Sequence, residues 1–253
     1  MPYIPRKEKV VFLTAFKGKN SLLKKSIDNL LMEMDENDIW VIVLDNQEFQ
    51  NINIDKRIKI LNYIGMPGAG NTRNYGLDYI LKLNLNNFLL WPIDSDDQLI
   101  QNSRSLIDQK FQKRKYNMIS FGCVQIYKRK KKEYSYEGEK SFRDLLKRYS
   151  TPCGSTIIRI SDNNLLKFLR FSTRKRANDQ LFFLSAARYF QSCMFFKNIV
   201  LLNYCQNSNS LSAKKWKQPF YKFLVLRDIG LNYFETLYFF SRYLIISFLK
   251  VIG

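Results

Sequence analysis

The sequence predicts an α/β fold in which a mostly parallel sheet is covered by helices on both faces. Continuous apolar runs of strand length alternate with amphipathic helical segments through the first 93 residues. These runs are rich in β-branched and aromatic residues and lack the polar alternation of a half-exposed strand, which is typical of buried parallel strands. The chain has 253 residues, 46% of them hydrophobic, so it can fill a substantial core.

The first 100 residues carry the clearest strand and helix signals. Two of the four apolar runs are followed by a turn and a segment in which apolar side chains recur at helical spacing. Two runs lead into aspartates, Asp45 and Asp94, and ligands of parallel sheets bind at the carboxyl ends of strands. We expect strands at 10–14, 39–44, 58–61 and 88–93, and helices at 21–34 and 72–83.

The second half predicts further strands and helices around a basic hairpin, whose tip is the run Lys128 to Lys132. Beyond residue 219 the chain is dense in aromatic and aliphatic residues. Charged residues interrupt this segment, so it has no uncharged span of 18 residues and a transmembrane helix is disfavoured. We expect strands at 118–127, 133–136, 155–160 and 199–204, and helices at 141–149 and 179–190.

Charge is distributed unevenly along the chain. Residues 1–100 hold 12 Lys+Arg and 13 Asp+Glu, a net charge of −1, whereas residues 101–253 hold 29 and 9, a net charge of +20. This asymmetry predicts a near-neutral half and a basic half that faces a nucleic acid, a phosphorylated substrate or an acidic membrane surface.

The chain contains no histidine, which excludes Ser-His-Asp and Cys-His catalysis and every His-ligated metal site. Acid–base chemistry therefore falls to carboxylates, lysine or tyrosine. The four cysteines show no C-x-x-C pair and no zinc spacing, so they are interpreted as buried thiols of a reducing compartment. No secretory signal is apparent at the N-terminus, and a cytoplasmic location is expected.

The stretch Asp94-Ser95-Asp96-Asp97 places three carboxylates within four positions at the end of a buried strand. Like charges this close raise one another's pKa unless a cation or hydrogen-bond donors compensate them. Mg²⁺ and Mn²⁺ take few carboxylates and complete their coordination with phosphate oxygens, so the stretch suits a divalent cation that carries a diphosphate. An ordinary Asp-rich turn is the alternative.

Several motifs, taken in order, resemble family 2 glycosyltransferases of the GT-A fold. An apolar strand and the first three of these motifs occur in the same order and at similar spacing as in that family, and the resemblance covers about residues 9–213. The stretches that carry it are V-L-D-N at 43–46, G-N-T-R-N-Y-G at 70–76, D-S-D-D at 94–97, T-P-C-G at 151–154, N-D-Q-L-F at 178–182, and L-N-Y at 202–204 with N-S-N-S-L-S at 207–212.

The resemblance implies roles for individual residues. Asp45 would hold the nucleobase, Arg73 would lie near the diphosphate, and Asp94 with Ser95 would contact the ribose or the metal. Asp96 would bind the cation with Asp97 beside it, and Asp179 would be the general base of an inverting transfer. Where the family has P-T-Y-N the chain has Thr14-Ala15-Phe16-Lys17, which puts Thr14 and Phe16 beside the base, and Asn178 replaces the usual Glu before the catalytic Asp.

The implied enzyme uses Mn²⁺ or Mg²⁺ to move a sugar from a nucleoside diphosphate sugar, UDP-linked by expectation, to a glycan or lipid-linked acceptor of the bacterial cell surface. Residues 1–213 would form the GT-A domain, with a donor half at 1–100 and an acceptor half at 101–213, followed by an aromatic extension at 214–253. The extension at 219–253 and the Lys128–Lys132 run are expected to contact the inner face of the cytoplasmic membrane. Packing of the extension on the domain or on a second copy in a homodimer is the alternative.

Two rival functions remain open from the sequence. A basic nucleic-acid-binding protein would use the Lys128–Lys132 run and the interleaved tyrosines, although no nucleic acid is expected for the glycosyltransferase. A sugar nucleotidyltransferase would need a Gly-rich, basic loop directly after the first strand, and Lys17-Gly18-Lys19-Asn20 is a poor version of that loop.

Overall fold

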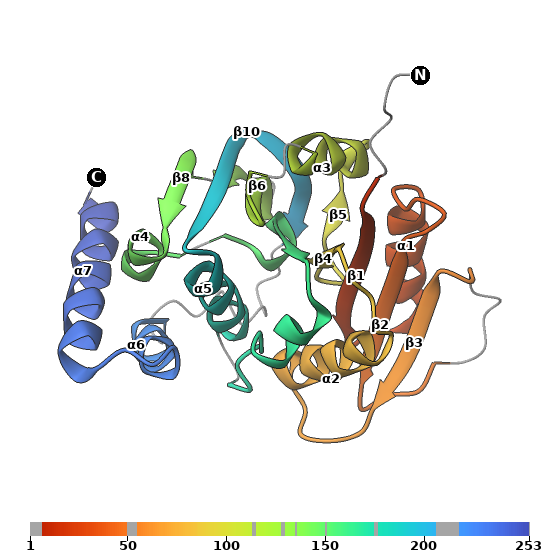
Figure 1. The fold of residues 1–253 in the computed structure, drawn as a ribbon, viewed down its shortest axis with the longest axis horizontal. Helices are drawn as coiled ribbons and strands as arrows, with labels where there is room; N and C mark the ends of the chain where they lie inside the picture. The colour runs from red at the N-terminus through yellow and green to blue at the C-terminus, as the bar shows by residue number, and fades with distance from the viewer. Residues whose placement is uncertain are drawn as a thin grey trace.

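A computed structural model describes residues 7–49, 55–112, 115–127, 130–134, 136–149, 151–174, 177–205 and 218–252. Within these residues the chain forms the predicted α/β fold, a ten-stranded sheet with helices on both faces (Figure 1). The strands are β1 (Lys9–Phe16), β2 (Ile39–Asp45), β3 (Ile58–Tyr63), β4 (Phe88–Pro92), β5 (Gln98–Leu99), β6 (Met118–Tyr127), β7 (Lys130–Tyr134), β8 (Gly138–Ser141), β9 (Thr156–Ile160) and β10 (Ser192–Cys205). The α-helices are α1 (Asn20–Leu31), α2 (Ala69–Lys82), α3 (Ser103–Phe111), α4 (Phe142–Lys147), α5 (Asn178–Phe190), α6 (Gln218–Asp228) and α7 (Tyr233–Ile252).

The sheet has the strand order β3-β2-β1-β4-β9-β6-β10-β5. Its first four strands are all parallel, as the alternation of apolar runs and helices predicts. Beyond β4 the sheet is mixed, because β9 runs antiparallel to both β4 and β6 while β10 runs parallel to β6. The first half therefore has the parallel arrangement whose strand ends gather ligands, and the second half extends it.

Two hydrophobic cores lie on the two faces of the sheet. One is built with the apolar side chains of α1 and α3, and the other with those of α2, α4 and α5. Side chains on successive strand positions divide between the cores: Val11 and Leu13 face the α2 side, and Phe12 faces the α1 side. This explains why the strands show continuous apolar runs.

The C-terminal helices pack onto the α2 side of the molecule. Val225 and Leu226 of α6 and Phe239 of α7 are buried in the same core that contains strand residues of β1. Figure 1 shows α7 at the end of the molecule opposite β3, with α6 between α7 and the loop below α5. No helix among the described residues is long and apolar enough to cross a membrane.

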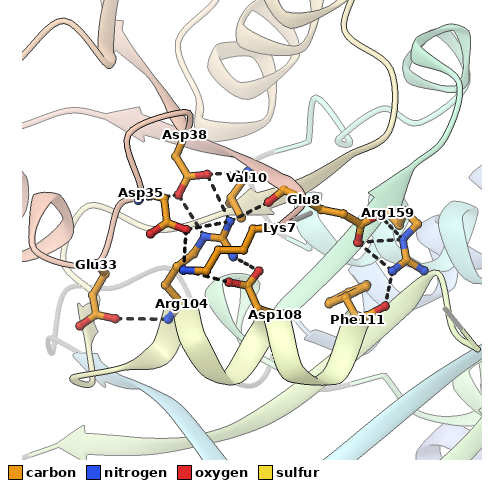
Figure 2. A network of polar contacts seen from close by, with 10 residues as sticks. All are labelled: Lys7, Glu8, Val10, Glu33, Asp35, Asp38, Arg104, Asp108, Phe111 and Arg159. Carbon is orange, nitrogen blue, oxygen red and sulfur yellow. Dashed lines mark hydrogen bonds and ion pairs between the residues drawn. The ribbon is translucent and has the colours of Figure 1, made fainter. Parts of the chain in front are cut away.

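A network of charged side chains fastens α3 to the amino-terminal ends of the strands (Figure 2). Arg104 of α3 is 4% exposed and pairs with Asp38 at 3.0 Å and with Asp108. Its Nη2 atom also donates to the carbonyl oxygen of Glu8 at 2.6 Å. Arg159 of β9 pairs with the Glu8 carboxylate at 2.8 Å, so this residue links the two arginines.

The predicted strands and helices are present, with three additions that the sequence did not indicate. The helix α3 is polar on average, β5 is two residues long, and β8 is a short edge strand, so none has a strong apolar pattern. Pro92 is tolerated in an interior strand because it is the last residue of β4, paired in register with Leu13. The predicted tip of the basic hairpin was the run Lys128 to Lys132. Its first two residues lie outside the described residues, as does the 207–212 motif, whereas residues 130–132 belong to β7, so the second strand begins earlier than predicted.

Candidate active site

Asp45 lies at the carboxyl end of β2 and is 5% exposed. One carboxylate oxygen accepts a hydrogen bond from the Asn46 side chain at 2.8 Å. The other accepts from the backbone N–H of Gly68 at 3.2 Å and lies 3.7 Å from the Lys17 amine. The structure thus places Asp45, which the sequence predicts to contact the nucleobase, next to the start of α2.

The start of α2 is shaped by glycines. Gly68 has a φ of 141°, a conformation that favours glycine, and it immediately precedes the helix. Two residues later, a Cβ on Gly70 would overlap the carbonyl oxygen of Ser172, so only glycine allows the helix to approach this segment. The glycine bend therefore holds α2 against the loop that leads into α5.

Arg73 lies in the second turn of α2 and is only 5% exposed. Its Nη2 atom forms an ion pair with Asp94, and its Nη1 atom donates to Asn178 Oδ1 at 3.1 Å. The guanidinium lies over the ring of Phe171, 5.2 Å from its centroid. Burial alone would lower the pKa of Arg73, but the acidic groups around it raise that pKa above its ordinary value.

The carboxylates of the acidic stretch after β4 lie in different environments. Asp96 reaches solvent, yet desolvation by the surrounding protein, with the charge of Asp94, raises its pKa to about 6. Asp97 is 5% exposed, and neither carboxylate oxygen has a hydrogen-bond partner. Burial, followed by the charges of Asp94 and Asp96, raises the pKa of Asp97 well above its usual range. Ser95, which lies between Asp94 and Asp96 in the sequence, is half-buried.

Asp97 approaches the chain closely at Gly154, within the T-P-C-G stretch. A Cβ on Gly154 would lie 2.8 Å from Asp97 Oδ2, which is too close for any other residue without a shift. The carbonyl oxygen of Gly154 accepts a hydrogen bond from the Trp91 indole at 2.7 Å, which fixes this turn against β4. The sequence pointed to Gly154 only through its motif, and the structure explains sterically why glycine occupies this position.

Asp179 lies in the first turn of α5 and is half-buried. The helix begins at Asn178 after Ala177, which has a φ of 54°, so Asp179 is the second residue of the helix and not its N-cap. Its Oδ1 atom accepts a hydrogen bond from the backbone N–H of Gln180 at 3.0 Å. Burial raises the pKa of Asp179, with the charge of Arg73 opposing the rise and that of Asp94 adding to it.

Thr14 and Phe16, which are predicted to contact the nucleobase of the sugar donor, lie in the core. The hydroxyl of Thr14 is buried and accepts a hydrogen bond from the Trp40 indole at 3.0 Å. Phe16 is 2% exposed and packs in the core on the α1 side. Neither presents a surface to a ligand in this conformation, so their contact with a nucleobase stays a prediction.

Sequence reasoning missed two contacts of Arg73, one with the ring of Phe171 and one with the side chain of Asn178. Phe171 lies below the guanidinium of Arg73 and stacks on Phe182 at 4.2 Å between ring centroids. A lone phenylalanine before a polar loop carries no sequence signal for this position. Asn178 was noted only as a departure from the family motif, and its hydrogen bond to Arg73 depends on a contact between residues 105 positions apart.

The acidic side chains after β4 are the candidate ligands for a divalent cation. Among the described residues, no group of three or more acidic, cysteine or histidine side chains is arranged to hold a metal. The two oxygens of Asp97 are nevertheless buried and have no hydrogen-bond partner, which is unusual for a carboxyl group. Mg²⁺ is commonly held by one or two carboxylates together with phosphate oxygens, and these residues supply no more protein ligands than that.

Comparison with known proteins finds solved structures with a similar fold but no match to the sequence. No protein-family model and no curated protein matches the chain. The crystal structure of S. aureus TarS 1–349 matches with a TM-score of 0.63 at 15% identity, covering 93% of this chain and 70% of that one. Its complex with UDP-GlcNAc matches with a TM-score of 0.67, again at 15% identity, over 93% and 71% of the two chains.

The complex of TarS 1–349 with UDP gives a TM-score of 0.62 at 15% identity, over 93% of this chain and 70% of that one. The longer TarS chain matches at 14% identity, and this chain covers 43% of it. At such low identity the likeness concerns the fold. The mixed α/β sheet with its parallel first half is a GT-A fold, as the sequence predicts.

Proposed function

We propose that this chain is an inverting glycosyltransferase that moves a sugar from a nucleoside diphosphate sugar, UDP-linked, to a glycan or lipid-linked acceptor. The observation that carries the proposal is the contact of Arg73 with Asp94 and Asn178, which joins three of the family 2 motifs. The solved structures with this fold include one in complex with UDP-GlcNAc and one with UDP, which supports the same class of donor.

The proposed mechanism assigns the donor to the strand ends. Asp45 contacts the nucleobase after exchanging its bonds to Asn46 and Gly68. Arg73 binds the diphosphate, which carries the charge that a buried guanidinium attracts. Asp94 and Asp96 would hold a divalent cation with Asp97 beside them, and that cation would stabilise the charge of the leaving diphosphate.

Asp179 is the proposed general base. Its raised pKa makes it a stronger base than an exposed aspartate, so it can accept the proton of an acceptor hydroxyl as that oxygen attacks the anomeric carbon. The attack displaces the diphosphate from the opposite face of the sugar and inverts the anomeric configuration. One carboxylate on the acceptor side suffices, which agrees with a chain that contains no histidine.

Calorimetric titration of the whole chain with UDP, GDP, CDP and dTDP, with and without Mn²⁺, tests the donor class. We expect UDP to bind more tightly than the other nucleotides and Mn²⁺ to strengthen its binding. Asp179→Asn should leave UDP affinity unchanged and abolish sugar transfer, whereas Asp96→Ala should weaken the Mn²⁺-dependent part of binding. Normal transfer by Asp179→Asn at saturating Mn²⁺ would rule out the assigned base.

We further propose that α7 places the enzyme on the inner face of an anionic membrane. Its outer side exposes a stripe of large apolar side chains, and the second half of the sequence carries the net charge of +20 that anionic lipids attract. The exposed members are Tyr233, Phe234, Leu237, Tyr238, Leu244, Ile245 and Phe248.

Point substitutions test this better than truncation, because α7 also fills the core. Phe234→Ser with Phe248→Ser should reduce co-sedimentation with phosphatidylglycerol vesicles without lowering the melting temperature. Tyr189→Ser, which removes another exposed aromatic ring, is the matched control. A loss of dimers in light scattering instead of a loss of vesicle binding would identify the stripe as a homodimer interface.

A further inference from the structure

The side chain of Arg73 contacts both sides of the proposed site. Asp94 comes from the end of β4, on the donor side, and Asn178 opens α5, on the acceptor side. One guanidinium holds both, through Nη2 and Nη1 respectively. Its Nε atom is buried and has no hydrogen-bond partner, so its hydrogen-bonding capacity is not exhausted.

Asn178 is itself fixed from two directions. Its backbone carbonyl oxygen accepts a hydrogen bond from the N–H of Ser172 at 3.0 Å, while its side-chain oxygen accepts from Arg73. The residue before it, Ala177, has a positive φ of 54°, which a non-glycine residue adopts only where the surroundings hold it. The placement of the first turn of α5, and with it Asp179, therefore depends on these contacts.

We propose that Asn178 is a positioning residue that, through Arg73, couples occupation of the diphosphate subsite to the placement of Asp179. The proposal rests on the proposed function. When a diphosphate takes over Nη2 from Asp94, the Nη1 bond to Asn178 persists and the start of α5 follows the guanidinium. The base is then held in its working position only when a donor is present.

The amide at position 178 suits this role better than a carboxylate. An amide oxygen is a neutral acceptor, so Asp94 is left as the ion-pair partner of Arg73 and a diphosphate can compete for the guanidinium. A carboxylate at 178 would form a second ion pair with Arg73 and add a negative charge beside Asp94 and Asp179. It would hold Arg73 more firmly and repel the diphosphate.

Hydrogen exchange on the whole chain, with UDP and Mn²⁺ as the probe, tests the coupling. In the wild type we expect UDP to slow amide exchange in the first turn of α5 by about 5-fold or more, the lower end of ordinary coupling between two sites. Asn178→Ala should still bind UDP in calorimetry but lose this UDP-dependent slowing. Asn164→Ala, an exposed asparagine in another turn, is the matched control and should behave as the wild type.

Asn178→Asp gives an independent readout that does not depend on exchange rates. We expect its UDP affinity to fall about 5-fold or more, because Arg73 is then held by two carboxylates. Wild-type UDP-dependent slowing in Asn178→Ala, or wild-type UDP affinity in Asn178→Asp, would overturn the proposal. If UDP bound to the wild type without any change in α5, the coupling proposal would be overturned and the proposed function would stand. If the chain bound none of the nucleotides, both the proposed function and the coupling proposal would be overturned.

Discussion

Replacing Arg104 with methionine should cost the protein a large part of its stability. The guanidinium is 4% exposed and neutralises Asp38 and Asp108, which are 2% and 8% exposed. Asp38 keeps hydrogen bonds from the backbone N–H groups of Val10 and Asp35, at 2.8 and 2.9 Å, but loses its counter-charge. Removing one partner from a buried ion pair typically costs about 3–5 kcal/mol.

For a chain of this length, each kcal/mol lowers the melting temperature by roughly 2–4 °C, so Arg104→Met should lower it by about 6–20 °C. Thermal unfolding followed by circular dichroism measures this shift. Lys7→Ala is the control, because Lys7 belongs to the same network but its side chain is 61% exposed, and its surface ion pairs contribute little. A melting temperature for Arg104→Met within 2 °C of the wild type would refute the reasoning.

The same variant should also change how stability depends on pH. Burial raises the pKa of Asp108, and Arg104 opposes that rise, so the pKa should climb further when Arg104 is lost. A carboxyl group with a raised folded-state pKa contributes stability when protonated, and this contribution is lost as pH rises through that pKa. Arg104→Met should therefore be more destabilising at pH 8 than at pH 5, and equal losses at both values would contradict this electrostatic explanation.

Three further predictions concern the site and its supports. Gly70→Ala should destabilise the chain by about 1–3 kcal/mol in urea unfolding, because the new methyl group overlaps the Ser172 carbonyl. Gly154→Ala should weaken Mn²⁺-dependent UDP binding more than Mn²⁺-free binding, because it displaces the Asp97 carboxylate, and calorimetry distinguishes the two. Mn²⁺-dependent UDP affinity should fall as pH is lowered through about 6, because Asp96 is protonated there, and an unchanged affinity at pH 5 would show that Asp96 is not a ligand.

The parallel half of the fold could be predicted from the sequence because its strands are buried on both faces. Continuous apolar runs such as the one that ends at Asp45 leave few other arrangements. The polar helix α3 was missed because its stability comes from Arg104, whose partners lie up to 96 positions away in the chain. Such contacts have no local signature.

The sequence motifs singled out candidate site residues, whose roles stay predictions, but not the contacts between them. They drew attention to Arg73, Asp94 and Asp179, yet no pattern indicated that Arg73 would hold Asn178. The expectation that Phe16 contacts a nucleobase rests on its position in a motif, which carries no information that the packing of α1 buries its ring. A motif indicates which chemical groups are present, whereas the burial of a side chain depends on the helices and strands that pack around it.

The docking of α6 and α7 has a consequence for synthesis on the ribosome. Val225 and Phe239 complete the core that also contains Val11 and Leu13, so the α2 side of the sheet stays open until about residue 239 has left the exit tunnel. The strands of the parallel half are made first, but the helix that carries Asp179 packs against elements made last. A nascent chain would therefore pass through a stage with a formed parallel half and an unfinished core on the α2 side, and that core would close only after α7 has left the exit tunnel.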